Sequence, residues 1–64
     1  MKTGKLKMML HDNEMTQGEL AEKLDIGEDT MTHKIKKRKD FWLREAKICA
    51  DLFGVTVDEL FFYD

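Results

Sequence analysis

The chain carries the same helix-start motif twice. Thr16 is followed three residues later by Glu19, and Thr56 is followed in the same way by Glu59. In such a capping box the Thr side chain accepts a hydrogen bond from the backbone N–H of the Glu, and the Glu side chain accepts one from the backbone N–H of the Thr. Two boxes therefore fix two helix starts, at residues 16 and 56.

Apolar residues frame both boxes as hydrophobic staples, Met15 with Leu20 and Val55 with Leu60. Apolar residues three and four apart predict three further helices. The five predicted helices cover residues 2–5 to 11, 17–24, 28 to about 36, 43–53 and 57 to about 62. Their predicted inner faces contain Leu6, Met9, Leu10, Leu20, Ala21, Leu24, Met31, Ile35, Leu43, Ala46, Cys49, Ala50 and Phe53. The β-prone patches 55–57 and 60–63 are assigned to helix because of the cap and their short length.

Composition narrows the class of protein. The chain has 64 residues, no Pro, four Gly and one Cys. We expect a single all-α domain over residues 1–64 with a thin core, because a chain of this length buries only about 60% of its unfolded surface. One Cys excludes an internal disulfide framework. The sequence has neither a membrane-length apolar run nor a signal peptide, so we expect a cytoplasmic protein.

Charge is distributed in blocks along the chain. The net charge is −2, from 11 Lys and Arg against 13 Asp and Glu. Residues 12–32 contain seven acids and one Lys, whereas residues 33–39 contain five cations and no acid. A mildly acidic total therefore conceals a concentrated basic segment, which is either a solvated helix end or a contact surface for an anionic partner.

Residues 15–35 read as a helix, a three-residue turn and a second helix. Such a pair binds DNA when its second helix enters the major groove and its first helix rests on the backbone. At this point the sequence resembles the Cro/cI-type (XRE-like, lambda-repressor-like) helix-turn-helix domains of phage and bacterial repressors. The resemblance covers nearly the whole chain and rests on three segments, MTQGELAEKL at 15–24, TMTHKI at 30–35 and EA…CADLFGVTVDELF at 45–61.

The resemblance implies a compact five-helix fold and a sequence-specific transcriptional regulator, Cro-like or repressor-like, of a phage or prophage switch. It implies double-stranded operator DNA as partner, bound by a homodimer, with the helix at about 28–36 in the major groove. The implied DNA-binding residues are Gln17 at the start of the first helix, Glu28, Asp29, Thr30, Thr32 and His33 on the second, and Lys34, Lys36, Lys37, Arg38 and Lys39 beside the backbone.

Two departures from the family pattern leave alternatives open. Relatives often carry Gln, Arg, Lys or Asn where this chain has Glu28 and Asp29. Carboxylates suit a helix N-terminus and can accept from cytosine, but they repel phosphate. Trp42 stands where relatives often have a Ser or Thr cap, and it is either core cover or an exposed anchor. Phe41 beside it is predicted to be core.

A second apolar stripe, Ile48 and Leu52, runs along the predicted helix 43–53. Together with the aromatic residues 61–63, this stripe provides more apolar surface than a thin core can bury. These side chains are therefore predicted either to close that core or to form a surface for a dimer or another partner. The predicted surface consists of Trp42, Ile48, Leu52, Phe62 and Tyr63.

The leading alternative function is a phage antirepressor or modulator. Its acidic surface would bind the basic DNA-reading face of a cognate repressor protein. An enzyme is disfavoured, because His11, His33, Cys49 and the acids lack the spacing of a catalytic triad or metal centre. No cofactor and no metal are predicted.

Overall fold

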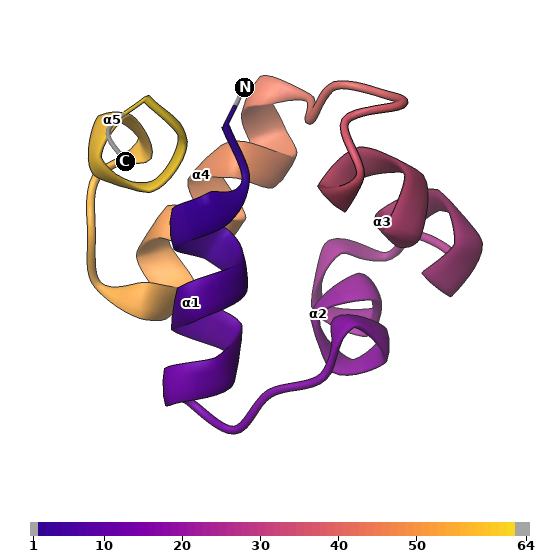
Figure 1. Ribbon diagram of the computed structural model, residues 1–64, viewed down its shortest axis with the longest axis horizontal. Coiled ribbons are helices and arrows are strands. Elements are labelled where there is room, and N and C mark those ends of the chain that lie inside the picture. Colours follow the sequence, from indigo (N-terminus) through magenta and orange to yellow (C-terminus); the bar gives the residue numbers. More distant parts are fainter. Residues whose placement is uncertain (1, 63–64) are drawn as a thin grey trace.

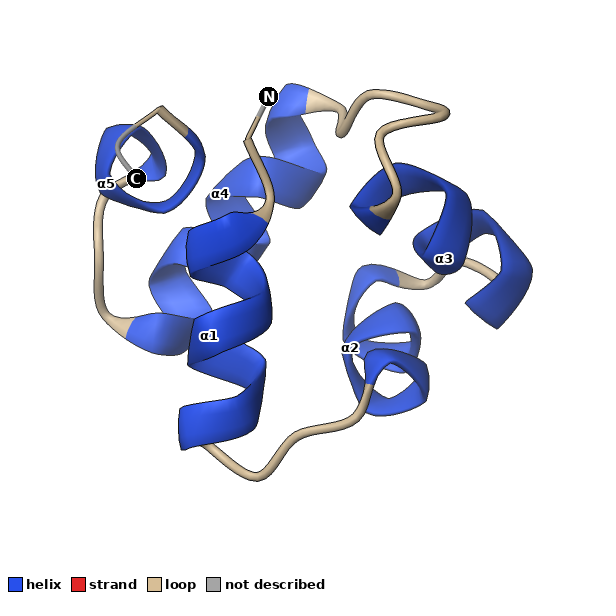
Figure 2. Cartoon of the chain, in the orientation of Figure 1, coloured by secondary structure: helices blue, strands red, loops and turns tan. Residues whose placement is uncertain are grey.

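The computed structural model describes residues 2–62, and five α helices account for most of them. They are α1 (Gly4–Asp12), α2 (Gln17–Leu24), α3 (Glu28–Ile35), α4 (Leu43–Phe53) and α5 (Val57–Phe61). Figure 1 shows α1, α4 and α5 on one side of the molecule and α2 and α3 on the other. Within residues 2–62 there is no strand (Figure 2), so the all-α prediction is confirmed.

Both predicted capping boxes are formed. The Thr16 hydroxyl accepts from the Glu19 N–H at 3.1 Å, and the Thr56 hydroxyl accepts from the Glu59 N–H at 3.1 Å. The reciprocal bonds to the two Glu carboxylates are also present. Gly54 ends α4 at φ +69°, the left-handed conformation that glycine adopts at no steric cost.

The core lies where the five helices meet. It contains Leu6, Leu10, Leu20, Ala21, Leu24, Met31, Ile35, Phe41, Ala46, Cys49, Ala50, Leu60 and Phe61. The Phe41 ring packs against that of Phe61 with centroids 5.1 Å apart, which confirms Phe41 as core. No helix among residues 2–62 has the length and apolar character needed to cross a membrane.

The N-terminal segment forms hydrogen bonds with the last residues of α3 and of α5. The Thr3 hydroxyl is buried and donates to the Ile35 carbonyl at 2.8 Å, which satisfies an otherwise unpaired group at the end of α3. The backbone N–H of Lys2 donates to the Phe61 carbonyl at 3.0 Å. The position of α3 is therefore fixed from both α1 and the core.

One predicted core position is wrong. Leu43 is 61% exposed although its spacing places it on the inner face of α4. The physical reason is that Leu43 is the first residue of α4, and Glu45 occupies the inner side of that turn with 1% exposure. Periodicity places residues on a face, but it does not show where the neighbouring elements end.

Candidate nucleic-acid interface

Helices α2 and α3 form a helix-turn-helix. Asp25 ends α2 at φ +57°, and Gly27 starts α3 in an extended conformation. Between them the Ile26 N–H donates back to the Ala21 carbonyl at 3.0 Å, and its side chain packs on the core. The turn is short enough to incline the two axes steeply, and in Figure 1 α2 is seen nearly end-on while α3 is seen from the side.

Helix α3 buries one face and presents the other. Met31 and Ile35 lie in the core. On the opposite side Asp29 is exposed, and Thr32 and His33 are half-buried. Glu28 is also exposed but lies on the same side as Met31 and Ile35, and Thr30 is half-buried. The outer face is polar along its full length, as a helix that reads base edges requires.

Gln17 links the two helices. It is exposed at the first position of α2, and its side-chain oxygen accepts from the Thr32 hydroxyl at 3.3 Å. The bond joins the start of α2 to the outer face of α3. The structure thus places two residues predicted to bind DNA side by side.

The basic segment predicted at the end of α3 lies just beyond the helix. Residues 36–39 form a turn in which all four side chains, Lys36, Lys37, Arg38 and Lys39, are exposed. The Arg38 N–H donates to the His33 carbonyl at 2.8 Å, and Lys37 is left-handed at φ +64°. These bonds close the end of α3, so that four exposed cations follow it directly.

Lys34 differs from its four basic neighbours. It is 4% exposed, and its ammonium forms an ion pair with Glu45, a residue that is 1% exposed. The ammonium also lies 5.1 Å from the ring centroid of Trp42 and 5.8 Å from that of Phe41. The expectation that Lys34 lies beside the DNA backbone is therefore corrected, because its charge is directed into the protein to join α3 to α4.

Sequence reasoning missed Glu45 as a partner of Lys34. The signal available was its position, three residues after Trp42 at the start of α4. Its Oε1 atom accepts from the Trp42 N–H at 2.8 Å, the same reach-back that the capping-box Glu residues make. The carboxylate is therefore held by α4 itself before it meets Lys34.

Glu28 lies against the start of α2. A Cβ atom added to Gly18 would come within 2.9 Å of the Glu28 Oε2 atom. The carboxylate therefore stands at the N-terminal turn of α2, where free backbone N–H groups and the helix dipole attract a negative charge. Within residues 2–62 neither Glu28 nor Asp29 has an ion-pair partner.

The predicted dimer or partner residues differ in their exposure and in the elements that carry them. Trp42 is 67% exposed and lies near α3, whereas Ile48, Leu52 and Phe62 belong to α4 and the end of α5. Ile48 is half-buried against the core, and Leu52 and Phe62 are exposed. Tyr63 lies outside the described residues.

The described part of the chain offers no arrangement for metal binding, since residues 2–62 contain no cluster of three or more His, Cys, Asp or Glu side chains placed for it. Cys49 is fully buried. Burial, and then the nearby Glu45 carboxylate, raise the pKa of its thiol from 9.0 to about 12. A thiol in this state is a small core residue and not a nucleophile.

Comparison with protein families agrees with this geometry. The family model described as the Cro/C1-type HTH DNA-binding domain matches residues 5–64. Searches of curated proteins and of solved structures gave no significant match. Because the family model covers nearly the whole chain, this protein belongs to the Cro/C1-type helix-turn-helix DNA-binding family.

Proposed function

We propose that this protein is a sequence-specific DNA-binding transcriptional regulator, Cro-like or repressor-like, that acts in a phage or prophage switch. Helix α3 enters the major groove, where Asp29, Thr32 and His33 face the bases. The observation that carries the proposal is that four exposed cations at 36–39 directly follow α3, whose outer face is polar. Family membership supports DNA as the ligand.

The residues proposed to contact DNA have different roles. Gln17 holds Thr32 and lies at the start of α2, where a phosphate meets free N–H groups. Lys36, Lys37, Arg38 and Lys39 neutralise phosphates and position α3, but they carry no sequence information. Thr30 lies beside the groove-facing residues. Lys34 joins α3 to α4 through its ion pair with Glu45.

The protein works as a cytoplasmic homodimer, and its chain folds as a single helix-turn-helix domain. Ile48, Leu52 and Phe62 of two copies pack together, because exposed apolar side chains on α4 and after α5 gain from mutual burial. Two recognition helices then meet half-sites about 34 Å apart on a palindromic operator. Oligomeric state is measured by sedimentation equilibrium with and without DNA.

The decisive experiment is a fluorescence titration with DNA from the promoter region of its own gene, at two salt concentrations. Specific binding that weakens strongly with salt supports the regulator, because each phosphate contact contributes about 0.9 to the salt slope. Binding that is equal for all sequences, or absent, contradicts it.

The basic turn provides a sharper prediction. Lys36→Ala with Lys37→Ala should lower the salt slope by about 1.8, because two phosphate contacts are lost. Relative affinities for different operator sequences should change little. The matched control is Lys47→Ala, an exposed Lys on α4. An unchanged slope in the double variant, with folding checked by circular dichroism, would exclude these contacts.

A second function is favoured by one observation, the two exposed and unpaired carboxylates of Glu28 and Asp29 at the front of α3. In this alternative the protein is an antirepressor. Its acidic front, which begins at Asp12, binds the basic DNA-reading face of a cognate repressor and competes with operator DNA.

Neutralising the two carboxylates separates the two functions. In the regulator, Glu28→Gln with Asp29→Asn should raise DNA affinity about tenfold, because each charge about 7 Å from a phosphate costs about 0.6 kcal/mol in water. In the antirepressor the same variant should lose binding to the repressor. The control is Asp51→Asn with Asp58→Asn, which removes two exposed acids outside the acidic segment 12–32.

A further inference from the structure

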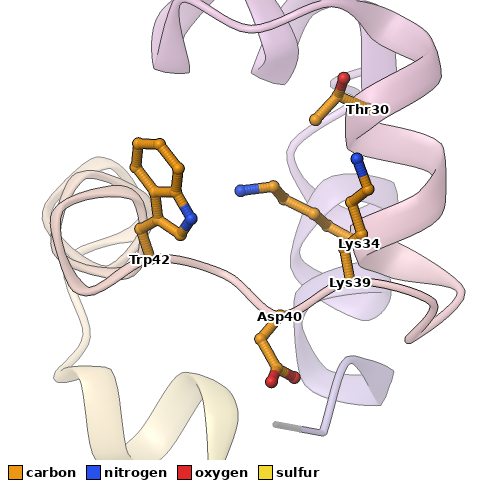
Figure 3. Close-up of a pocket in the computed structure, with 5 residues that line it drawn as sticks. All are labelled: Thr30, Lys34, Lys39, Asp40 and Trp42. Carbon is orange, nitrogen blue, oxygen red and sulfur yellow. The ribbon is translucent and has the colours of Figure 1, made fainter.

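A pocket of about 380 Å³ opens between α3 and the start of α4. It is lined by Thr30 and Lys34 from α3, Lys39 and Asp40 from the connecting loop, and Trp42. Figure 3 shows Trp42 on one side of the space and Thr30 with the lysines on the other. The volume falls within the range of small-molecule sites, which typically combine an aromatic wall with few polar groups.

The charged residues that line the pocket differ in whether they already have an interaction partner in the protein. The Lys34 charge is neutralised by Glu45, and Asp40 has an interaction of its own and points away from the other four side chains in Figure 3. Lys39 is exposed and has no ion-pair partner within residues 2–62. One uncompensated positive charge therefore borders the space.

The apolar wall of the pocket, formed by Trp42, is also open to a ligand. Trp42 is 67% exposed, although a buried or half-buried position is usual for so large an apolar side chain. The Lys34 ammonium lies over its ring at 5.1 Å, which fixes the orientation of the indole. Thr30 is half-buried across the pocket, and its side chain makes no hydrogen bond within residues 2–62, so that its hydroxyl is free to donate or accept.

We propose that this pocket binds a small aromatic acid, a flat ring that carries one negative charge. The ring packs against the indole of Trp42, and the acidic group accepts from the Lys39 ammonium and the Thr30 hydroxyl. A neutral ring would leave Lys39 unused, and an anion without a ring would leave Trp42 exposed to water. The chemistry of the lining thus selects both parts of the ligand.

Ligand binding affects the proposed DNA interface, and this consequence rests on the proposed function. Lys39 belongs to the basic turn, and Thr30 borders the groove-facing side of α3. A bound acid neutralises one of the four cations and places a negative group beside the phosphate path. Occupancy of the pocket should therefore weaken DNA binding.

The experiment is an amide NMR titration of the full chain with benzoate, with acetate and benzyl alcohol as matched probes. Benzoate should saturate with a Kd of about 10 mM, which corresponds to about 0.3 kcal/mol for each of its nine non-hydrogen atoms and lies well below the ceiling for small ligands. Shifts should concentrate at Thr30, Lys39, Asp40 and the Trp42 indole N–H. Lys39→Gln should weaken benzoate about fivefold, whereas Lys37→Gln should not.

Several results would overturn the proposal. Equal shifts with acetate would show attraction to surface charge alone, and equal affinity for benzyl alcohol would show that no anion is recognised. An identical loss in both Lys variants would place the anion on the loop and not in the pocket. At constant ionic strength benzoate should also lower DNA affinity. If DNA does not bind at all, the proposed function fails and the NMR titration still decides the pocket.

Discussion

Replacement of Lys34 by Met is expected to destabilise the protein by about 3–5 kcal/mol, because it leaves the Glu45 carboxylate buried without its partner. A 64-residue fold has only about 3–10 kcal/mol of stability in total. The variant should therefore lose a large part of its stability. Urea denaturation followed by circular dichroism measures the effect.

The partner gives the complementary variant. Glu45→Gln keeps an oxygen that can accept from the Trp42 N–H, so it removes the charge and retains the helix start. It leaves the Lys34 ammonium buried and unpaired, at a similar cost. The double variant, Lys34→Met with Glu45→Gln, removes both charges and should recover most of the loss.

The control for this cycle is Lys36→Met, an exposed Lys two residues further on, which should change stability by no more than about 0.5 kcal/mol. Additive losses in the double variant would show that the two side chains do not interact. The cycle also tests the interface, because only Lys36, and not Lys34, should affect the salt dependence of DNA binding.

The stability of the protein should fall steeply in alkali because of Cys49. Burial raises the pKa of its thiol from 9.0 in a solvated chain to about 12 in the fold. Above pH 9 the unfolded chain releases the thiol proton while the folded chain keeps it. The stabilisation is therefore complete below pH 9 and is lost toward pH 12, at about 1.4 kcal/mol per pH unit.

The matched control is Cys49→Ala, which has no thiol to titrate. Its smaller side chain lowers stability by an amount independent of pH. The difference between the two proteins, from urea unfolding at pH 8, 9 and 10, should shift by about 1 kcal/mol over the last interval, in which the unfolded thiol goes from half to almost fully ionised. A constant difference would contradict a raised pKa. The thiol should also react with a disulfide reagent at pH 8 only as fast as the protein unfolds.

Much of the fold was predictable from local signals. The two Thr–Glu boxes are local hydrogen-bonded motifs, so the starts of α2 and α5 follow from the residues alone. Gly54 was predictable in the same way, because its left-handed conformation favours glycine. The basic turn at 36–39 was also visible, since a run of four cations is too costly to bury.

Other features depended on contacts between residues distant in the sequence. The five cations at 33–39 look alike as a run, yet Lys34 is buried while Lys36 to Lys39 are exposed. Only the approach of α4, which brings in Glu45 and the ring of Trp42, decides this. For the same reason Leu43 is exposed and the pocket beside α3 could not be predicted from the sequence.

The five helices, the helix-turn-helix and the separation of acidic and basic blocks follow from the order of the residues, because they depend on interactions within a few residues. The tertiary structure alone decided which cations remain available to DNA and which one joins α3 to α4. It also placed Trp42 beside Thr30 and Lys34 of α3, with which it lines one pocket. The physical reason is that burial of a charge or a ring depends on distant partners.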